Sequence, residues 1–125
     1  MGADPNLAEP AFRIFTNVAN AWSLTTLEQS TLLGQPVADA FAVSRTEIID
    51  DRWAEVLERM SYIIGIYRAL HTIFPNAQQA DGWIRRPNTA ALFRGAPAIT
   101  LICSGRLSDL SDVLAYLDSQ GIAAP

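Results

Sequence analysis

Lysine is absent from this 125-residue sequence, and cysteine and histidine occur once each, as Cys103 and His71. A single cysteine excludes an internal disulfide and any zinc site built from several cysteines. No hydrophobic run approaches the roughly 18 residues that a membrane-spanning helix needs. Because no basic segment followed by an apolar one opens the chain, we expect a cytoplasmic protein that makes no use of a membrane.

Residues suited to catalysis are equally scarce. Without a second histidine or a cysteine at ligand spacing, a metal at His71 would need several carboxylates from elsewhere, so we interpret His71 as a packing or surface residue. Cys103 follows an apolar run and is interpreted as a small buried hydrophobic residue. The dipeptide Arg94-Gly95 lacks the further glycine and lysine of a phosphate-binding loop. The sequence therefore predicts neither an enzyme nor a bound cofactor or metal.

The few charges are unevenly distributed. Residues 1–60 contain nine acidic residues and four arginines, a net charge of −5, whereas residues 61–125 contain four acidic residues and five arginines, a net charge of +1. All basic residues are arginines, which form bidentate pairs with carboxylates and phosphates. The acidic first half is therefore poorly suited to binding the phosphates of nucleic acid.

The pattern of apolar residues predicts an all-α fold with some seven helices in a single domain. Residues 1–9 read as a flexible leader, and residues 10–75 as a helix-turn-helix-like portion that includes a long central helix. Helices are expected at residues 10–22, 36–41 and 51–74. Three more are expected from a capping box at Thr25–Glu28 to Gly34, from the cap Asn76 to Trp83, and from Pro97 to Gly105. A last helix is expected to end at Gly121.

The long helix gives the strongest periodic signal. One apolar position recurs every three or four residues for about seven turns. Pro75 ends this pattern, and the internal Gly65 is expected to mark close packing against a neighbouring helix. The predicted core face comprises Ile49, Trp53, Val56, Leu57, Met60, Ile63, Ile64, Tyr67, Leu70 and Phe74.

Two short helices around Gly34 have the outline of a DNA-binding helix-turn-helix. A recognition helix needs arginine, lysine, asparagine or glutamine to contact bases and phosphates. Residues 35–41 offer only Gln35 and contain an acid, Asp39; Arg45 lies just beyond. Because this half of the chain is also acidic, the sequence favours a hairpin for packing or dimerisation over one that binds DNA.

The stretch from Asp81 to Tyr116 is the most distinctive part of the chain. Arg85 and Arg86 follow Trp83, and Arg94 precedes a second break in the helical pattern, so three arginines lie in or beside loops. Loops carry binding residues disproportionately, and arginine is well suited to pairing with carboxylates at an interface. The alternative is that these arginines are simply solvated loop residues. The sequence alone leaves both interpretations open.

Several segments of the chain, in this stretch and before it, resemble the Xre/MbcA/ParS antitoxins, and most of all their short ParS-like members. The similar segments, which together extend the resemblance from about Ala11 to Gly121, are 58–71, Phe74-Pro75-Asn76, Trp83-Ile84-Arg85-Arg86-Pro87-Asn88, 104–110 and 113–118. Their order and spacing are what is specific to the family. The chain differs where the family has a glycine-rich turn, since it reads Ala91-Leu92-Phe93-Arg94-Gly95.

The resemblance implies an antitoxin of a type II toxin–antitoxin system whose small helical module, residues 76–125, binds a RES-domain toxin that consumes NAD or ADP-ribosylates a target. It also implies a homodimer or a hetero-oligomer with the toxin, and autorepression by DNA binding as the alternative function. An anionic group near the C-terminus could imitate the pyrophosphate of NAD in the toxin's pocket. The expected toxin-binding residues are Arg85, Arg86, Asn88, Arg94, Tyr116, Asp118, Gly121, Ile122 and Pro125.

Overall fold

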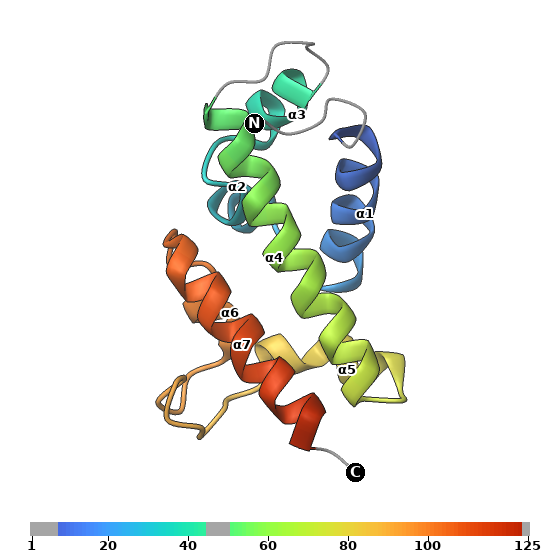
Figure 1. Cartoon of the computed structure of the whole chain (residues 1–125), viewed down its shortest axis with the longest axis vertical. Coiled ribbons are helices and arrows are strands. Elements are labelled where there is room, and N and C mark those ends of the chain that lie inside the picture. The colour runs from blue at the N-terminus through green and yellow to red at the C-terminus, as the bar shows by residue number, and fades with distance from the viewer. Residues whose placement is uncertain (1–7, 45–50, 124–125) are drawn as a thin grey trace. The chain divides into compact units, whose positions relative to one another are not determined.

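The computed structural model describes residues 8–44 and 51–123 and confirms the all-α prediction. These residues form α1 (Ala8–Ala21), α2 (Thr26–Leu33), α3 (Val37–Ser44), α4 (Asp51–Ile73), α5 (Ala77–Gly82), a 3-10 turn η2 (Trp83–Arg85), α6 (Ala98–Ile102) and α7 (Leu107–Ala123) (Figure 1). Within them the only extended pairing is one antiparallel bridge between Pro87 and Pro97. None of the described helices is both long and apolar enough to cross a membrane.

The chain divides into two compact units, Met1–Ile64 and Gly65–Pro125, called here the N-terminal and the C-terminal unit. The long helix α4 contributes its first part to the N-terminal unit and its last part to the C-terminal unit. Residues 61–64 carry no charge, so the N-terminal unit retains the net charge of −5 and the C-terminal unit the net charge of +1. The division in structure therefore coincides with the division in charge.

In the N-terminal unit, the predicted signals around α2 are confirmed. The Thr25 hydroxyl accepts the amide of Glu28 at 3.0 Å, and the Glu28 carboxylate accepts the amide of Thr25 at 2.9 Å, which completes the capping box. Gly34 ends the helix in the left-handed conformation, with φ +79°, and its amide donates to the carbonyl of Ser30 at 3.0 Å. Three residues then separate α2 from α3, which packs on both α1 and α2.

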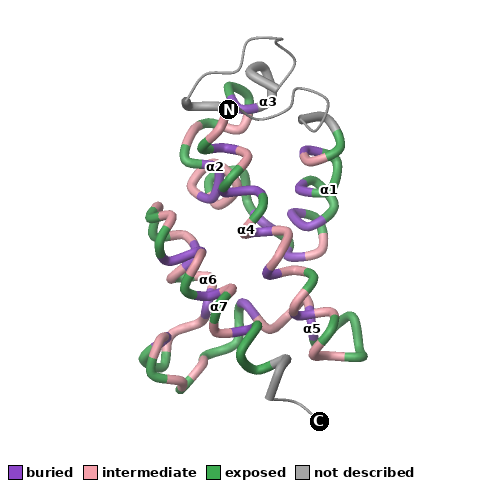
Figure 2. Tube along the Cα trace, in the orientation of Figure 1, coloured by how far each residue is buried: buried purple, intermediate pink, exposed green. Residues whose placement is uncertain are grey.

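The buried face of α1 and the first part of α4 supply the core of this unit (Figure 2). Phe12 and Phe15 meet edge to face, with ring centroids 6.4 Å apart, a favourable arrangement of aromatic rings. The buried apolar residues of the unit are Phe12, Phe15, Val18, Ala19, Trp22, Leu24, Leu32, Leu33, Ala40, Val56, Met60 and Ile63.

The predicted core face of α4 is confirmed in its centre. Val56, Met60, Ile63 and Leu70 are buried, whereas the predicted Leu57, Ile64, Tyr67 and Phe74 are only half-buried. Ile66, which the sequence pattern missed, is fully buried. It continues the spacing of three from Met60 and Ile63, so the buried stripe shifts around the helix. The side chains of the predicted Ile49 and Trp53 lie outside the described residues.

The C-terminal unit is built on the last part of α4, the three short segments α5, η2 and α6, and α7. Asn76 caps α5 as predicted, its side-chain oxygen accepting the amide of Gln79 at 3.1 Å. A Cβ added at Gly65 would lie 3.0 Å from a methyl group of Leu114, which confirms that Gly65 permits close packing of α4 on α7. The buried apolar residues are Ile66, Leu70, Ala80, Ile84, Phe93, Ala98, Ile102, Leu110, Val113 and Leu117.

The predicted end of the last helix at Gly121 is wrong. The helix α7 continues through Gly121 to Ala123. A glycine weakens a helix interior by only about 1 kcal/mol relative to alanine, which the hydrogen bonds of a 17-residue helix tolerate. Residues 119–123 are therefore a helical extension rather than a tail without a fold of its own.

A buried arginine explains why the turn after α2 needs glycine. The Arg59 side chain is paired with Glu55 at 3.3 Å, and its residue is only 8% exposed. A Cβ added at Gly34 would lie 2.8 Å from the Arg59 Nε, closer than real Cβ contacts. Replacing Gly34 thus combines a left-handed backbone with a clash against a buried side chain.

We therefore expect Gly34→Ala to lower the free energy of unfolding by more than the roughly 1–2 kcal/mol of the left-handed conformation alone. Gly95→Ala is the matched control, because Gly95 has φ +86° but nothing within 4 Å of an added Cβ. Urea denaturation measures both. Equal losses for the two variants would show that Arg59 does not pack against Gly34.

Candidate functional site

The segment from Arg86 to Pro97 forms a closed loop that Asn88 holds together. The Asn88 amide donates to the carbonyl of Ala96 at 3.2 Å, and its carbonyl accepts the amide of Gly95 at 2.8 Å. Its side-chain oxygen accepts the amide of Ala90 at 2.9 Å, which fixes the first turn inside the loop. The structure therefore shows Asn88, an expected toxin-binding residue, in a structural role at the base of the loop.

Phe93 anchors this loop to the rest of the C-terminal unit. Its ring is buried and meets Trp83 of η2 at a centroid distance of 5.6 Å and Tyr116 of α7 at 5.3 Å, both edge to face. Tyr116, another expected toxin-binding residue, is half-buried by this contact. The three rings bring together η2, the loop and α7. Trp83 and Tyr116, the two that lie farthest apart in sequence, are separated by 33 residues.

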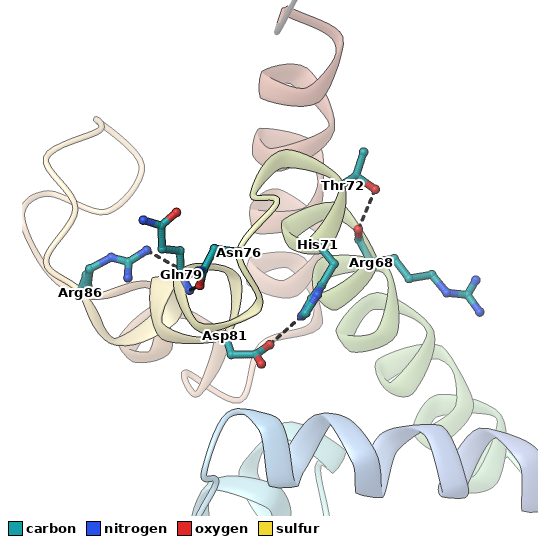
Figure 3. Close-up of polar contacts among 7 residues, drawn as sticks. All are labelled: Arg68, His71, Thr72, Asn76, Gln79, Asp81 and Arg86. Atoms are coloured by element: carbon teal, nitrogen blue, oxygen red, sulfur yellow. Dashed lines mark hydrogen bonds and ion pairs between the residues drawn. The ribbon is translucent and has the colours of Figure 1, made fainter.

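The three loop arginines differ in what holds them. Arg86 donates from Nη2 to the carbonyl of Gln79 at 2.9 Å and so braces the end of α5 (Figure 3). Arg85 ends η2 with its side chain exposed. Arg94 is exposed beside the buried Phe93, and to the other described residues its side chain makes no hydrogen bond or ion pair.

A fourth arginine, which sequence reasoning did not single out, is held by a small polar network. Arg106 lies 3.0 Å from the Asp109 Oδ2 through Nε and 2.9 Å through Nη2. The same oxygen accepts the Ser104 hydroxyl at 2.6 Å, and the Asp109 side chain is only 13% exposed. Sequence spacing held a clue, since Asp109 lies three residues after Arg106 at the start of a helix, where an acid is favoured.

His71 has a partner that the sequence did not reveal. Its Nε2 lies 2.7 Å from the Asp81 Oδ1, which joins the end of α4 to α5 (Figure 3). The edge of the Tyr67 ring packs on the imidazole at a centroid distance of 4.2 Å. His71 thus contributes to the packing between α4 and α5, and no three potential metal ligands come together among the described residues. Cys103 is half-buried rather than buried.

The remaining predicted residues lie on other elements or outside the described residues. Asp118 is exposed on α7, and Gly121 and Ile122 lie in its last turn, where side chains are not described. Pro125 lies outside the described residues. Of the possible DNA-binding residues, Gln35 is half-buried in the turn between α2 and α3, and Arg45 lies outside the described residues.

Comparison with known proteins agrees with the division of the chain into an N-terminal and a C-terminal unit. The described residues form a small all-α protein whose C-terminal unit carries exposed arginines in and beside the loop from Arg86 to Pro97. Residues 69–120, all within that unit, match the family model of the antitoxin Xre/MbcA/ParS C-terminal toxin-binding domain. Residues 69–120 of the chain therefore belong to the Xre/MbcA/ParS antitoxin family, as its C-terminal toxin-binding domain.

The chain is also similar over most of its length to a protein of a bacterium. It is 35% identical over 114 residues to the uncharacterized protein y4oB of Sinorhizobium fredii (strain NBRC 101917 / NGR234). The alignment covers 85% of this chain and 80% of that protein. No solved structure matches the chain.

The aromatic anchor of the loop can be tested directly. We expect Phe93→Ala to lower the free energy of unfolding by about 3–5 kcal/mol, because the change removes a buried ring and leaves a cavity. Phe93→Leu should cost less, since it restores most of the apolar volume without the edge-to-face contacts. Guanidinium denaturation compares the two. A loss below about 1 kcal/mol for Phe93→Ala would contradict an anchoring role.

Proposed function

We propose that this chain is the antitoxin of a type II toxin–antitoxin system and that it neutralises a RES-domain toxin by direct binding that covers the toxin's active site. The observation that carries the proposal is the match of residues 69–120 to an antitoxin toxin-binding domain, which falls entirely within the C-terminal unit. Most of the segments that resemble the antitoxins of RES-domain toxins lie within this range. In this proposal the antitoxin has no catalytic activity and acts in the cytoplasm, as a homodimer or a hetero-oligomer with the toxin.

The charge of the C-terminal unit supports binding to a protein rather than only packing within the chain. From Asp81 to Asp109 the sequence contains Arg85, Arg86, Arg94 and Arg106 and no acidic residue between its two ends. Arginine is enriched at protein interfaces because its planar guanidinium binds carboxylates in two-pronged pairs. An acidic rim on the toxin would therefore suit this surface and would orient the complex.

Co-expression tests the proposal in its simplest form. The toxin encoded beside this chain is induced alone or together with the antitoxin, and growth is followed. We expect the full chain to relieve growth arrest and to co-purify with the toxin in a defined stoichiometry. Growth arrest that persists despite equal expression of both proteins, with no complex recovered, would contradict the proposed function.

How the toxin is inhibited is a separate question, and the end of α7 is the proposed inhibitor. Its last turns present the exposed Asp118, an anionic group of the kind that could occupy a pyrophosphate site. Because residues 119–123 continue the helix, they would enter a pocket as a stiff rod rather than as a flexible strand.

Deleting residues 119–125 separates binding from inhibition. If the end of α7 covers the active site, the truncated chain should bind the toxin within about tenfold of the full chain, yet NAD consumption should resume. The rate of NAD loss in the purified complex measures this. Full inhibition by the truncated chain would instead assign the inhibitory surface to residues 81–117.

A further inference from the structure

Beside the loop from Arg86 to Pro97 lies an open cleft to which no function has been assigned above. Its volume is about 440 Å³, within the ~300–1,000 Å³ typical of ligand-sized clefts. Loop residues form one side, and α6 with the turn after it forms the other. The lining residues are Leu92, Phe93, Arg94, Ala96, Pro97, Thr100, Leu101, Ser104 and Arg106.

Both charged residues of this lining are arginines. Arg94 comes from the loop and Arg106 from the turn before α7, so two arginines from different segments line the same cleft. Asp109 neutralises part of the charge of Arg106, but it occupies only the Nε and Nη2 side of the guanidinium. The Arg106 side chain remains 70% exposed, which leaves Nη1 available to a ligand. The buried carboxylate thereby orients Arg106 at the edge of the cleft.

The backbone of Arg94 is an independent sign that its side chain is needed. Arg94 has φ +54°, in the left-handed region that costs a residue with a Cβ about 1 kcal/mol or more, and Gly95 follows at φ +86°. Glycine or asparagine would satisfy this position at lower cost. Strain of this kind persists where the surrounding structure fixes the conformation, and it clusters at functional sites.

The apolar part of the lining distinguishes between anionic ligands. Leu92, Pro97 and Leu101 offer aliphatic surface between the two arginines. A bare phosphate would gain nothing from this surface, whereas a peptide segment with an acidic and an apolar side chain would bury the latter against it. Thr100 and Ser104 complete the lining as its two residues with a hydroxyl group.

We propose that this cleft is the socket of the antitoxin for an acidic segment of the toxin, with a carboxylate held between Arg94 and Arg106 and an apolar neighbour seated on Leu92 and Leu101. The inference rests on the proposed function and deepens it, because it assigns the residues of the C-terminal unit that recognise the partner. Arg86 and Asn88 then hold the loop in shape, and Arg94 makes the contact.

Two variants of the cleft test the socket in the purified full chain. Arg94→Asn removes the cation and suits the left-handed backbone, so it should not lower the melting temperature. Thr100→Glu places a carboxylate at the edge of the cleft, on an exposed position of α6. We expect each variant to weaken binding of the toxin by about tenfold to a hundredfold, measured by titration calorimetry.

The control variants change residues outside the cleft and outside residues 69–120, the region that matches the family model. Arg68→Ala removes an exposed arginine of α4 whose guanidinium extends away from α5 (Figure 3). Thr16→Glu adds a carboxylate on the exposed face of α1. Both controls should bind the toxin within about threefold of the parent chain. As a further step, Arg94→Glu should regain affinity toward a toxin in which the contacting acid is changed to arginine.

The outcomes separate the inference from the proposed function. If the parent chain binds the toxin but Arg94→Asn and Thr100→Glu bind equally well, the socket is wrong and the antitoxin function stands. If the parent chain binds no toxin, both are wrong. Inorganic pyrophosphate gives a third arm: saturable shifts of the amide resonances of Arg94 and Thr100 at millimolar pyrophosphate would make this a phosphate site and overturn the acidic-segment assignment.

Discussion

The C-terminal unit depends on the burial of one ring, that of Phe93. The backbone hydrogen bonds from Asn88 to Ala96 and the β-bridge between Pro87 and Pro97 join residues of the loop to one another, so a buried side chain is needed to attach the loop to the rest of the unit. Phe93 supplies the anchor by packing between Trp83 and Tyr116. These contacts connect η2, the loop and α7 in one cluster, and everything that the loop presents to a partner inherits its position from that cluster.

Four arginines whose contacts the structure describes fall into two groups. Arg59, Arg86 and Arg106 each meet an acid or a carbonyl of the chain itself and stabilise a turn or a helix end. Arg94 has no such contact with the described residues and occupies a strained backbone position. Composition alone shows nine equivalent cations; their contacts distinguish those that hold the fold from those available for recognition. A carboxylate on a partner can pair most readily with a guanidinium that is not already satisfied.

Much of the fold follows from local signals in the sequence. The capping box at Thr25, the left-handed Gly34, the cap at Asn76 and the long apolar period of α4 act over a few residues, so each could be predicted. Contacts between distant residues could not. His71 meets Asp81, and Phe93 meets Tyr116, only after the helices have packed. For the same reason the three hydrogen bonds by which Asn88 closes the loop were not predicted.

The end of α7 shows where local reasoning failed and what that means for inhibition. Gly121 was expected to end the helix because glycine is the commonest residue after a helix C-terminus. Here the helix runs on to Ala123, since one glycine costs about as much as one or two further helical hydrogen bonds provide. A helical end has lost its conformational entropy before it meets a partner, so it pays less on binding than a disordered tail. It also has a fixed direction. If α7 covers the toxin's active site as proposed, the contacts around the loop set its direction, because Tyr116 of α7 packs on Phe93.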